Sequence, residues 1–280
     1  LDDADRKDDA IRADAMAAAD VTILCLPDEA AKQATSTARK LSARLIDAST
    51  AHRIDPGFIY GFAELLKDGE RQIAEAQYVS NPGCYPTGFL ALVRPLIEAG
   101  WLSADAMLHV PAVSGYSGGG KAMIAQYEAG NAPAYGSYGL NLAHKHLPEM
   151  TQHAGLSNAP LLLPSVGNFA QGMLVSVMLD KSYLSKAVSV DNIKELYQTR
   201  YQADSLLTVG TDNELTEHGF LAADALAGTD RLELFVFADS QNDRLVLTSR
   251  LDNLGKGASG AAVQNLNLML GRDMLAGLCV

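Results

Sequence analysis

Hydrophobic residues in the first third of the chain form short runs that alternate with longer amphipathic segments. Compact apolar runs typical of buried strands are "VTILCLP" (21–27), "RLIDAST" (44–50) and "AQYVS" (76–80). An alanine-rich helix is predicted over 28–42, because Asp28 and Glu29 place acids at the positive end of its dipole. A short amphipathic helix is predicted over 8–19. Strands alternating with helices indicate a parallel sheet with right-handed crossovers.

The polar residues that follow these strands are expected to lie along one edge of that sheet. They are 27–28, 49–50 and 80–84. Ligands of parallel α/β sheets bind at the carboxyl ends of the strands. This edge is therefore the first place to look for a site.

The second half has a different pattern. Runs that predict strands are "LHVPAV" (108–113), "PLLLPSV" (160–166) and "GMLVSVML" (172–179). The runs "RLELFVFADS" and "RLVLTSRL" flank a polar turn at 241–243, as in an antiparallel hairpin. Residues 255–271 return to a helical pattern. We expect an α+β domain with an antiparallel sheet, and the length of 280 residues favours two domains.

Composition narrows the classes of protein. A hydrophobic fraction of 48% with 20% charged residues describes a globular protein, and no apolar run approaches the ~20 residues that cross a bilayer. The net charge of −11 argues against nucleic-acid and anionic-membrane partners. Three scattered cysteines form neither a disulfide framework nor a metal site. We therefore expect a cytoplasmic protein without metal.

Cys84 lies in "SNPGCYPT", directly before an apolar helical pattern. Pro86 suits the first turn of a helix, where a missing N–H has no intrahelical partner. Cys84 would then lie at a helix N-terminus, where unpaired N–H groups and the helix dipole stabilise a thiolate. Most free cysteines are small buried hydrophobes, and position alone leaves both interpretations open.

His144, His146 and Glu149 share the segment "LAHKHLPEM". A histidine base with an orienting neighbour is one interpretation. A metal site is another, although no cysteine is spaced to complete it. A pair of hydrogen-bonded or surface histidines without function is the third.

The glycine-rich segment "SGYSGGGKA" (114–122) fits two short motifs. Residues 115–121 match the Walker A frame, but Ala122 stands where a Mg²⁺-binding Ser or Thr is required. Residues 115–119 match G-x-S-x-G, which would make Ser117 the nucleophile of a serine hydrolase. A simpler interpretation is a loop whose N–H groups and Lys121 hold an anion.

The ordered set of these segments resembles the N-acetyl-γ-glutamyl-phosphate reductases, in particular their shorter type. The segments that carry the resemblance are "CLPDEAA", "IDASTAHR", "VSNPGCYPTGF", "AVSGYSGGGK", "HKHLPE", "PSVGNFAQGM" and "LDNLGKGASGAAVQNLNLMLG". Each is weak alone, but the set runs in order along nearly the whole chain. The resemblance implies the aspartate-semialdehyde dehydrogenase-like fold, a Rossmann-type domain followed by an α+β substrate domain.

The resemblance also implies a reaction, the NADPH-dependent reduction of an acyl phosphate in arginine biosynthesis. Cys84 is implied as the nucleophile that expels phosphate and forms a thioester, which hydride then reduces to the semialdehyde. His144 is implied as the acid/base, and His146 and Glu149 as groups that orient the substrate or the base. Which of the two histidines is the acid/base stays open at this stage.

Further roles follow from the same resemblance. Residues implied to bind substrate are Arg53, Ser114, Gly115, Tyr116, Lys121, His146, Glu149 and Gln171. Residues implied to bind NADP(H) are Cys25, Leu26, Pro27, Ser49, Thr50, Gly257 and Ala258. Arg6 and Lys7 fall where a 2′-phosphate would lie. The implied domains are 1–83 for the dinucleotide, 84–252 for substrate and dimerisation, and 253–280 as a C-terminal helix returning to the first domain. A homodimer or homotetramer is expected.

The sequence departs from the family pattern at one point. The family binds NADP through a G-x-x-G-x-x-G turn, and no such turn occurs before Val21. We expect that the first strand and its turn precede Leu1. Alternative functions are a related acyl-phosphate reductase acting on aminoadipate or aspartyl phosphate, a serine hydrolase using Ser117, and a binding protein without activity.

Overall fold

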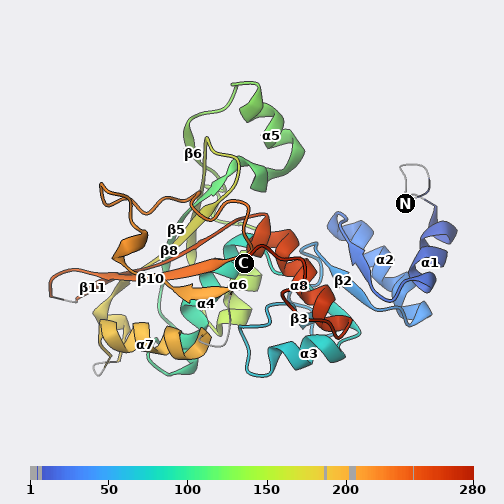
Figure 1. Cartoon of the computed structure of the whole chain (residues 1–280), viewed down its shortest axis with the longest axis horizontal. Helices are drawn as coiled ribbons and strands as arrows, with labels where there is room; N and C mark the ends of the chain where they lie inside the picture. The colour runs from blue at the N-terminus through green and yellow to red at the C-terminus, as the bar shows by residue number, and fades with distance from the viewer. Residues whose placement is uncertain (1–4, 6–7, 186–187, 202–205, 242) are drawn as a thin grey trace. The chain divides into compact units, whose positions relative to one another are not determined.

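The computed structural model describes residues 5, 8–185, 188–201, 206–241 and 243–280. Arg6, Lys7 and Asn242 lie outside the described residues. The chain divides into two compact units (Figure 1). Unit 1 holds residues up to Pro82 together with Ala261–Leu278, and unit 2 holds Gly83–Gly260 with the last two residues.

Unit 1 is built on a parallel sheet of four strands in the order β1-β2-β4-β3. The strands are β1 (Thr22–Leu24), β2 (Leu45–Asp47), β3 (Ile59–Tyr60) and β4 (Tyr78–Ser80). The helices are α1 (Asp9–Ala18), α2 (Asp28–Leu41), α3 (Gly69–Glu75) and α8 (Gly260–Met269). The predicted helices over 8–19 and 28–42 and all three predicted strands are confirmed.

Two hydrophobic clusters form the core of unit 1. One joins buried Ile46 and Val79 of the sheet to Leu268 and Met269 of α8. The other packs α1 and α2 against the sheet through Met16, Ala34, Ala38 and Leu45. The C-terminal helix therefore belongs to the core of a sheet formed by residues about 200 positions earlier in the chain.

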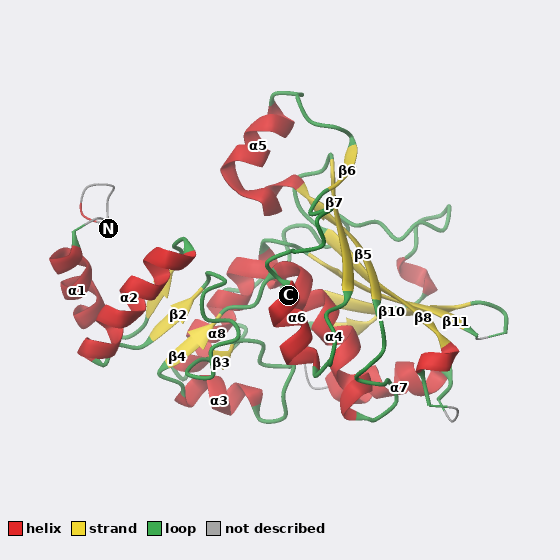
Figure 2. Cartoon of the chain, turned by 180° about the vertical axis from the view of Figure 1, so that it is seen from behind, coloured by secondary structure: helices red, strands yellow, loops and turns green. Residues whose placement is uncertain are grey.

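Unit 2 contains a seven-stranded sheet in the order β6-β7-β5-β8-β11-β10-β9 (Figure 2). The strands are β5 (His109–Gly115), β6 (Tyr135–Ser137), β7 (Leu161–Gly167), β8 (Met173–Asp180), β9 (Leu207–Val209), β10 (Leu232–Ala238) and β11 (Arg244–Leu251). The predicted hairpin is confirmed, because β10 pairs antiparallel with β11. The sheet as a whole is mixed and not antiparallel, since β5 pairs parallel with β7 and β9 with β10. The parallel pairing of β5 with β7 was not predicted, because a long crossover joins these strands and no hairpin turn marks them as neighbours.

Helices cover one face of this sheet. Here α4 (Cys84–Glu98) packs on β8 and β11, beside α6 (Leu147–Ala154) and α7 (Val190–Tyr201). The apolar face of α4 explains this position, because Phe89, Leu92 and Leu96 are fully buried. The remaining helix of unit 2, α5 (Gly120–Glu128), projects from the sheet beside β6 (Figures 1 and 2).

The opposite face of the sheet carries partly exposed apolar side chains. They alternate with buried ones along β7 and β8, as the two-residue period of a strand requires. Met178 is 51% exposed and Leu163 43%. Within the described part of the chain, no helix is long and apolar enough to cross a bilayer.

Candidate active site

Cys84 is the first residue of α4, as the sequence predicts. The chain reaches it through β4, and Gly83 caps the helix with an extended backbone. The buried N–H of Gly83 donates a hydrogen bond of 2.8 Å to Oε1 of Glu149. The half-buried Cys84 therefore lies at the positive end of a fifteen-residue helix, where a thiolate is stabilised.

Gly257 packs directly against Cys84. A β-carbon at position 257 would lie 2.9 Å from Cβ of Cys84 and 3.0 Å from the carbonyl oxygen of Asp252. Gly257 belongs to a single π-helical turn, Gly255–Ser259, that precedes α8. Such turns are frequent at functional sites. A side chain at position 257 would therefore clash with the Cα and Cβ atoms of Cys84, and only glycine fits there without a shift.

His144 and His146 contact each other beside Tyr85. Their ring centroids are 4.7 Å apart, and Nδ1 of His144 accepts a hydrogen bond of 3.2 Å from the backbone N–H of His146. Neutral His144 therefore carries its proton on Nε2. Burial, and then the positive charge of Lys145, lower the pKa of His144 below its usual 6.5. His144 is thus neutral at physiological pH, with Nε2–H as a donor.

Two tyrosines, Tyr85 and Tyr138, join this group, and neither was predicted to belong to the site. Tyr138 donates a hydrogen bond of 3.0 Å to the hydroxyl of Tyr85, which donates to the carbonyl of Ser165. Burial raises the pKa of Tyr85 strongly, and Tyr138 and then Cys84 add to the rise. The pKa of Tyr138 is raised mainly by burial, and Cys84 contributes there too. A negative charge on Cys84 therefore raises the pKa of both phenols, and both stay protonated.

The glycine-rich segment is more ordered than the predicted loop. Tyr116 and Ser117 belong to a 3₁₀ turn, Tyr116–Gly119, and their N–H groups donate to the carbonyls of Phe169 and Ala170. Ser117 accepts a hydrogen bond of 2.9 Å from Asn253. Among the described residues no histidine bonds to Ser117, so the triad of a serine hydrolase is not formed.

Other predicted substrate residues of unit 2 differ in their surroundings. Ser114 is buried at the end of β5 and donates to the carbonyl of Gly115. Lys121 is exposed in the first turn of α5. Gln171 is half-buried and donates to Asp252. Ala258 follows Gly257 in the π-helical turn.

Asp252 and Asn253 connect the loops around Cys84. Asn253 donates to Ser117 and accepts from the N–H of Gly172, so one side chain joins the glycine-rich segment to the loop before β8. Both residues lie in the segment "LDNLGKGASG", in which only Gly257 and Ala258 were predicted to belong to the site. No local sequence pattern marks either residue, because their partners lie far away in the chain.

Unit 1 carries the remaining predicted residues at the carboxyl ends of its strands. Cys25, Leu26 and Pro27 follow β1, and Ser49 and Thr50 follow β2. Side chains hold the second turn in place, since Asp47 accepts from the N–H and hydroxyl of Ser49, and Asp28 from those of Thr50.

Arg53 and His52 close that turn. Arg53 is buried and donates to the carbonyl of Ala48. His52 bonds to Asp47 at 2.6 Å and stacks on Phe58. The buried Asp47–His52 pair was not predicted.

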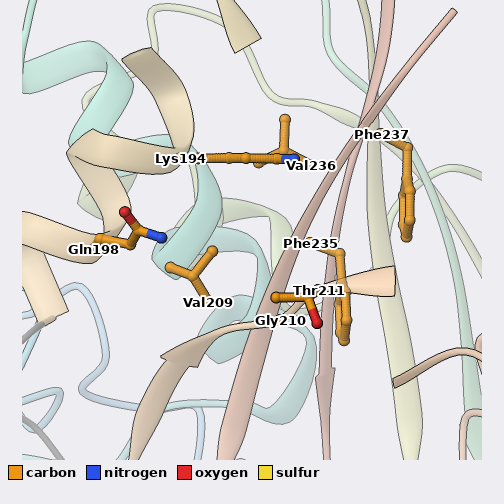
Figure 3. A pocket seen from close by; sticks show the side chains of 8 residues that line it. All are labelled: Lys194, Gln198, Val209, Gly210, Thr211, Phe235, Val236 and Phe237. Carbon is orange, nitrogen blue, oxygen red and sulfur yellow. The ribbon is translucent and has the colours of Figure 1, made fainter. Parts of the chain in front are cut away.

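The structure thus brings Cys84, both histidines, Glu149 and Gly257 together within unit 2. Within the described ranges, no three His, Cys, Asp or Glu residues are placed to hold a metal ion. A pocket of about 200 Å³ lies elsewhere in unit 2, between α7 and β10 (Figure 3). Lys194, Phe235 and Phe237 line it, and none of its lining residues was predicted to belong to the site.

Comparison with known proteins identifies the family. Residues 84–253 match the family of the semialdehyde dehydrogenase dimerisation domain, and residues 3–73 match the semialdehyde dehydrogenase NAD binding domain. The chain is 49% identical over 278 residues to the N-acetyl-γ-glutamyl-phosphate reductases of Brucella ovis and Brucella abortus, covering 97% of this chain and 90% of each relative. The chain belongs to the N-acetyl-γ-glutamyl-phosphate reductase family.

Solved structures confirm the fold of this family member. Aspartate-semialdehyde dehydrogenase II from Vibrio cholerae matches with a TM-score of 0.71 at 15% identity, over 91% of this chain and 81% of that one. Aspartate-semialdehyde dehydrogenase from Francisella tularensis matches with a TM-score of 0.70 at 12% identity, over 92% and 84%. The predicted fold class, a Rossmann-type domain with a second α+β domain, is confirmed.

Proposed function

We propose that this chain reduces N-acetylglutamyl 5-phosphate to N-acetylglutamate 5-semialdehyde and phosphate, using NADPH, in arginine biosynthesis. One structural observation carries the chemistry. Cys84 begins α4 at the positive end of its dipole, and Gly257, which has no side chain, packs against it. The name of the reductases that are 49% identical supports the substrate and the reaction.

Cys84 is the proposed nucleophile. Its thiolate attacks the acyl-phosphate carbonyl carbon, the C–O bond to phosphate breaks, and a thioester forms with release of phosphate. NADPH, when bound, supplies the hydride that reduces this thioester. The resulting thiohemiacetal collapses to the aldehyde and restores the thiolate. A thiolate suits this sequence because it attacks well near neutral pH.

His144 is the proposed acid/base. In the neutral form it holds a proton on Nε2, since Nδ1 accepts the N–H of His146. Nε2–H can donate to the oxygen that becomes negative as the carbonyl is attacked or reduced. His146 and Glu149 position the site, His146 by holding the His144 ring and Glu149 by holding the helix cap at Gly83.

Substrate binding is proposed for the residues that the family resemblance implies. They are Arg53, Ser114, Gly115, Tyr116, Lys121 and Gln171. Lys121 and Arg53 are cations suited to a phosphate group.

NADP(H) is proposed to bind at the carboxyl ends of β1 and β2. The turn after β2 ends in the short hydroxyl side chains of Ser49 and Thr50, and ligands of parallel sheets bind at this edge. The proposed residues are Cys25, Leu26, Pro27, Ser49, Thr50, Gly257 and Ala258. Residues 1–83 form the proposed dinucleotide-binding domain, 84–252 the substrate and dimerisation domain, and 253–280 the returning C-terminal helix.

A homodimer or homotetramer is proposed through the uncovered face of the unit 2 sheet. The dimerisation-domain family matches this unit, and Met178 and Leu163 expose apolar surface there. Light scattering of wild type and Met178→Lys tests this. We expect the variant to dissociate, and an unchanged mass would contradict the assignment. A cytoplasmic location is also proposed, supported by three free thiols, of which Cys25 and Cys279 are exposed.

The test of function is NADPH oxidation with N-acetylglutamyl phosphate, beside aspartyl phosphate and N-blocked aminoadipyl phosphate. We expect turnover on the first substrate, loss of turnover in Cys84→Ser, and unchanged turnover in the matched control Cys279→Ser. Full activity of Cys84→Ser would refute the proposal. Preference for another acyl phosphate would move the chain to a related reductase, and nucleotide-independent ester cleavage lost in Ser117→Ala would make it a hydrolase.

A further inference from the structure

Gln171 is held by a buried carboxylate. Its Nε2 donates a hydrogen bond of 3.2 Å to Oδ2 of Asp252, whose side chain is 1% exposed. The same carboxylate accepts from the N–H of Gly228 at 2.6 Å and from the N–H of Leu254 at 2.8 Å. All three partners of Asp252 are therefore donors, as an ionised carboxylate requires.

This contact fixes which end of the Gln171 amide faces the carboxylate. An ionised carboxylate only accepts, so the NH₂ end must point to Asp252 and a flipped amide would set two acceptors against each other. The carbonyl oxygen Oε1 then faces away. No residue in the described part of the chain bonds to Oε1, and Gln171 is only half-buried. Gln171 therefore presents one fixed, unused acceptor.

Gln171 is linked by contacts and hydrogen bonds to the segments around the proposed nucleophile. A β-carbon at Gly115 would come within 2.8 Å of the backbone nitrogen of Gln171, so the two segments touch. On its other side, Asp252 accepts the N–H of Gly257 through its carbonyl, and Gly257 packs on Cys84. Asp252 therefore links Gln171 to Gly257, the glycine that packs against Cys84.

We propose that Oε1 of Gln171 accepts the amide N–H of the substrate's acylamino group and so selects substrates with an N–H at the α-carbon, with Asp252 as the positioning residue. This rests on the proposed function. The carboxylate, the phosphate and the acetyl carbonyl of N-acetylglutamyl phosphate are all acceptors. Its amide N–H is its one donor, and an oriented acceptor can pair with nothing else on it.

The test compares two aldehydes in the oxidative direction, with NADP⁺ and phosphate. One is N-acetylglutamate 5-semialdehyde, and the other is its ester analogue, in which oxygen replaces the amide N–H. We expect the wild type to favour the amide by about tenfold in kcat/KM, the scale of one neutral hydrogen bond with an acceptor left unpaired by the analogue. Gln171→Met is expected to lose that preference by slowing the amide alone. Gln198→Met, the same change at an exposed position of α7, is the control and keeps it.

Asp252→Asn tests the positioning role, because an amide at 252 no longer dictates the orientation of Gln171. Asp252→Asn is expected to lower the ratio of kcat/KM for the amide to kcat/KM for the ester when position 171 is glutamine. In a Gln171→Met background, the same change should leave that ratio unchanged. A purely structural residue would lower both rates together and would leave the ratio in place.

The outcomes separate the two proposals. A wild type that does not distinguish the aldehydes, or a Gln171→Met variant that slows both equally, would overturn the role of Gln171 while leaving the reductase activity standing. A wild type inactive on both aldehydes would overturn the proposed function and this inference with it. Circular dichroism of each variant shows that the fold is retained.

Discussion

Gly257 and Cys84 are packed so closely that a β-carbon at position 257 would lie 2.9 Å from the β-carbon of the cysteine. Real β-carbons essentially never approach to that distance. The contact joins two segments more than 170 positions apart in the chain, the start of α4 and the π-helical turn before α8. The packing around the proposed nucleophile therefore requires a residue without a side chain at position 257.

Gly257→Ala is expected to reduce activity strongly, because Cys84 or the turn must move to admit the methyl group. Overpacking of this kind costs about 1–3 kcal/mol of unfolding free energy. NADPH oxidation and urea unfolding measure the two effects. Gly136→Ala is the matched control, since its β-carbon would meet only a proline side-chain atom, at 3.3 Å. A fully active Gly257→Ala would contradict the role given to this contact.

Glu149→Ala is expected to destabilise the protein by about 1–3 kcal/mol, the cost of leaving a buried N–H unpaired. The N–H concerned belongs to Gly83, the cap of α4. Glu149→Gln keeps an acceptor oxygen and is expected to cost less. Chemical denaturation gives the values, with Glu195→Ala on the exposed side of α7 as control. Equal stability of Glu149→Ala and wild type would show that the cap is not held by this carboxylate.

His144 is expected to titrate below 6.5, because burial and then Lys145 disfavour its charged form. The unfolded chain then binds more protons than the native state near pH 6.5, so this group lowers the folding stability as the pH falls through 6.5. Lys145→Met should raise the pKa of His144 without bringing it to 6.5, because burial is the larger cause.

NMR titration of the His144 ring, assigned with His144→Asn, measures this pKa. Lys194→Met, on α7, is the control and should leave the titration where it is. A midpoint at or above 6.5 in the wild type, or no upward movement in Lys145→Met, would contradict the account.

Much of the fold follows from local patterns. The strands of unit 1 and the β10–β11 hairpin are readable because each has its own apolar period and a bounding turn. The strand β3 and the helix α3 were missed, since two residues and seven residues give too little periodicity. The mixed order of the unit 2 sheet was also missed. Parallel pairing of β5 with β7 is decided by the chain between them and not by either strand alone.

Only part of the candidate site could be predicted from the sequence. Cys84 carries a local signal in the helix that starts with it. Asp252, Asn253 and Tyr138 carry none, because their importance comes from hydrogen bonds to residues between 24 and 136 positions away. Long-range contacts of this kind become visible only once the chain is folded.

Trapping the proposed thioester on Cys84 tests the mechanism without relying on turnover. The protein is incubated with N-acetylglutamyl phosphate without NADPH, quenched in acid, digested and analysed by mass spectrometry. We expect an N-acetylglutamyl adduct on the peptide that contains Cys84. The adduct should be sensitive to hydroxylamine, matched by released phosphate and absent from Cys84→Ala. An adduct on Ser117, or NADPH-dependent turnover in Cys84→Ala, would contradict this mechanism.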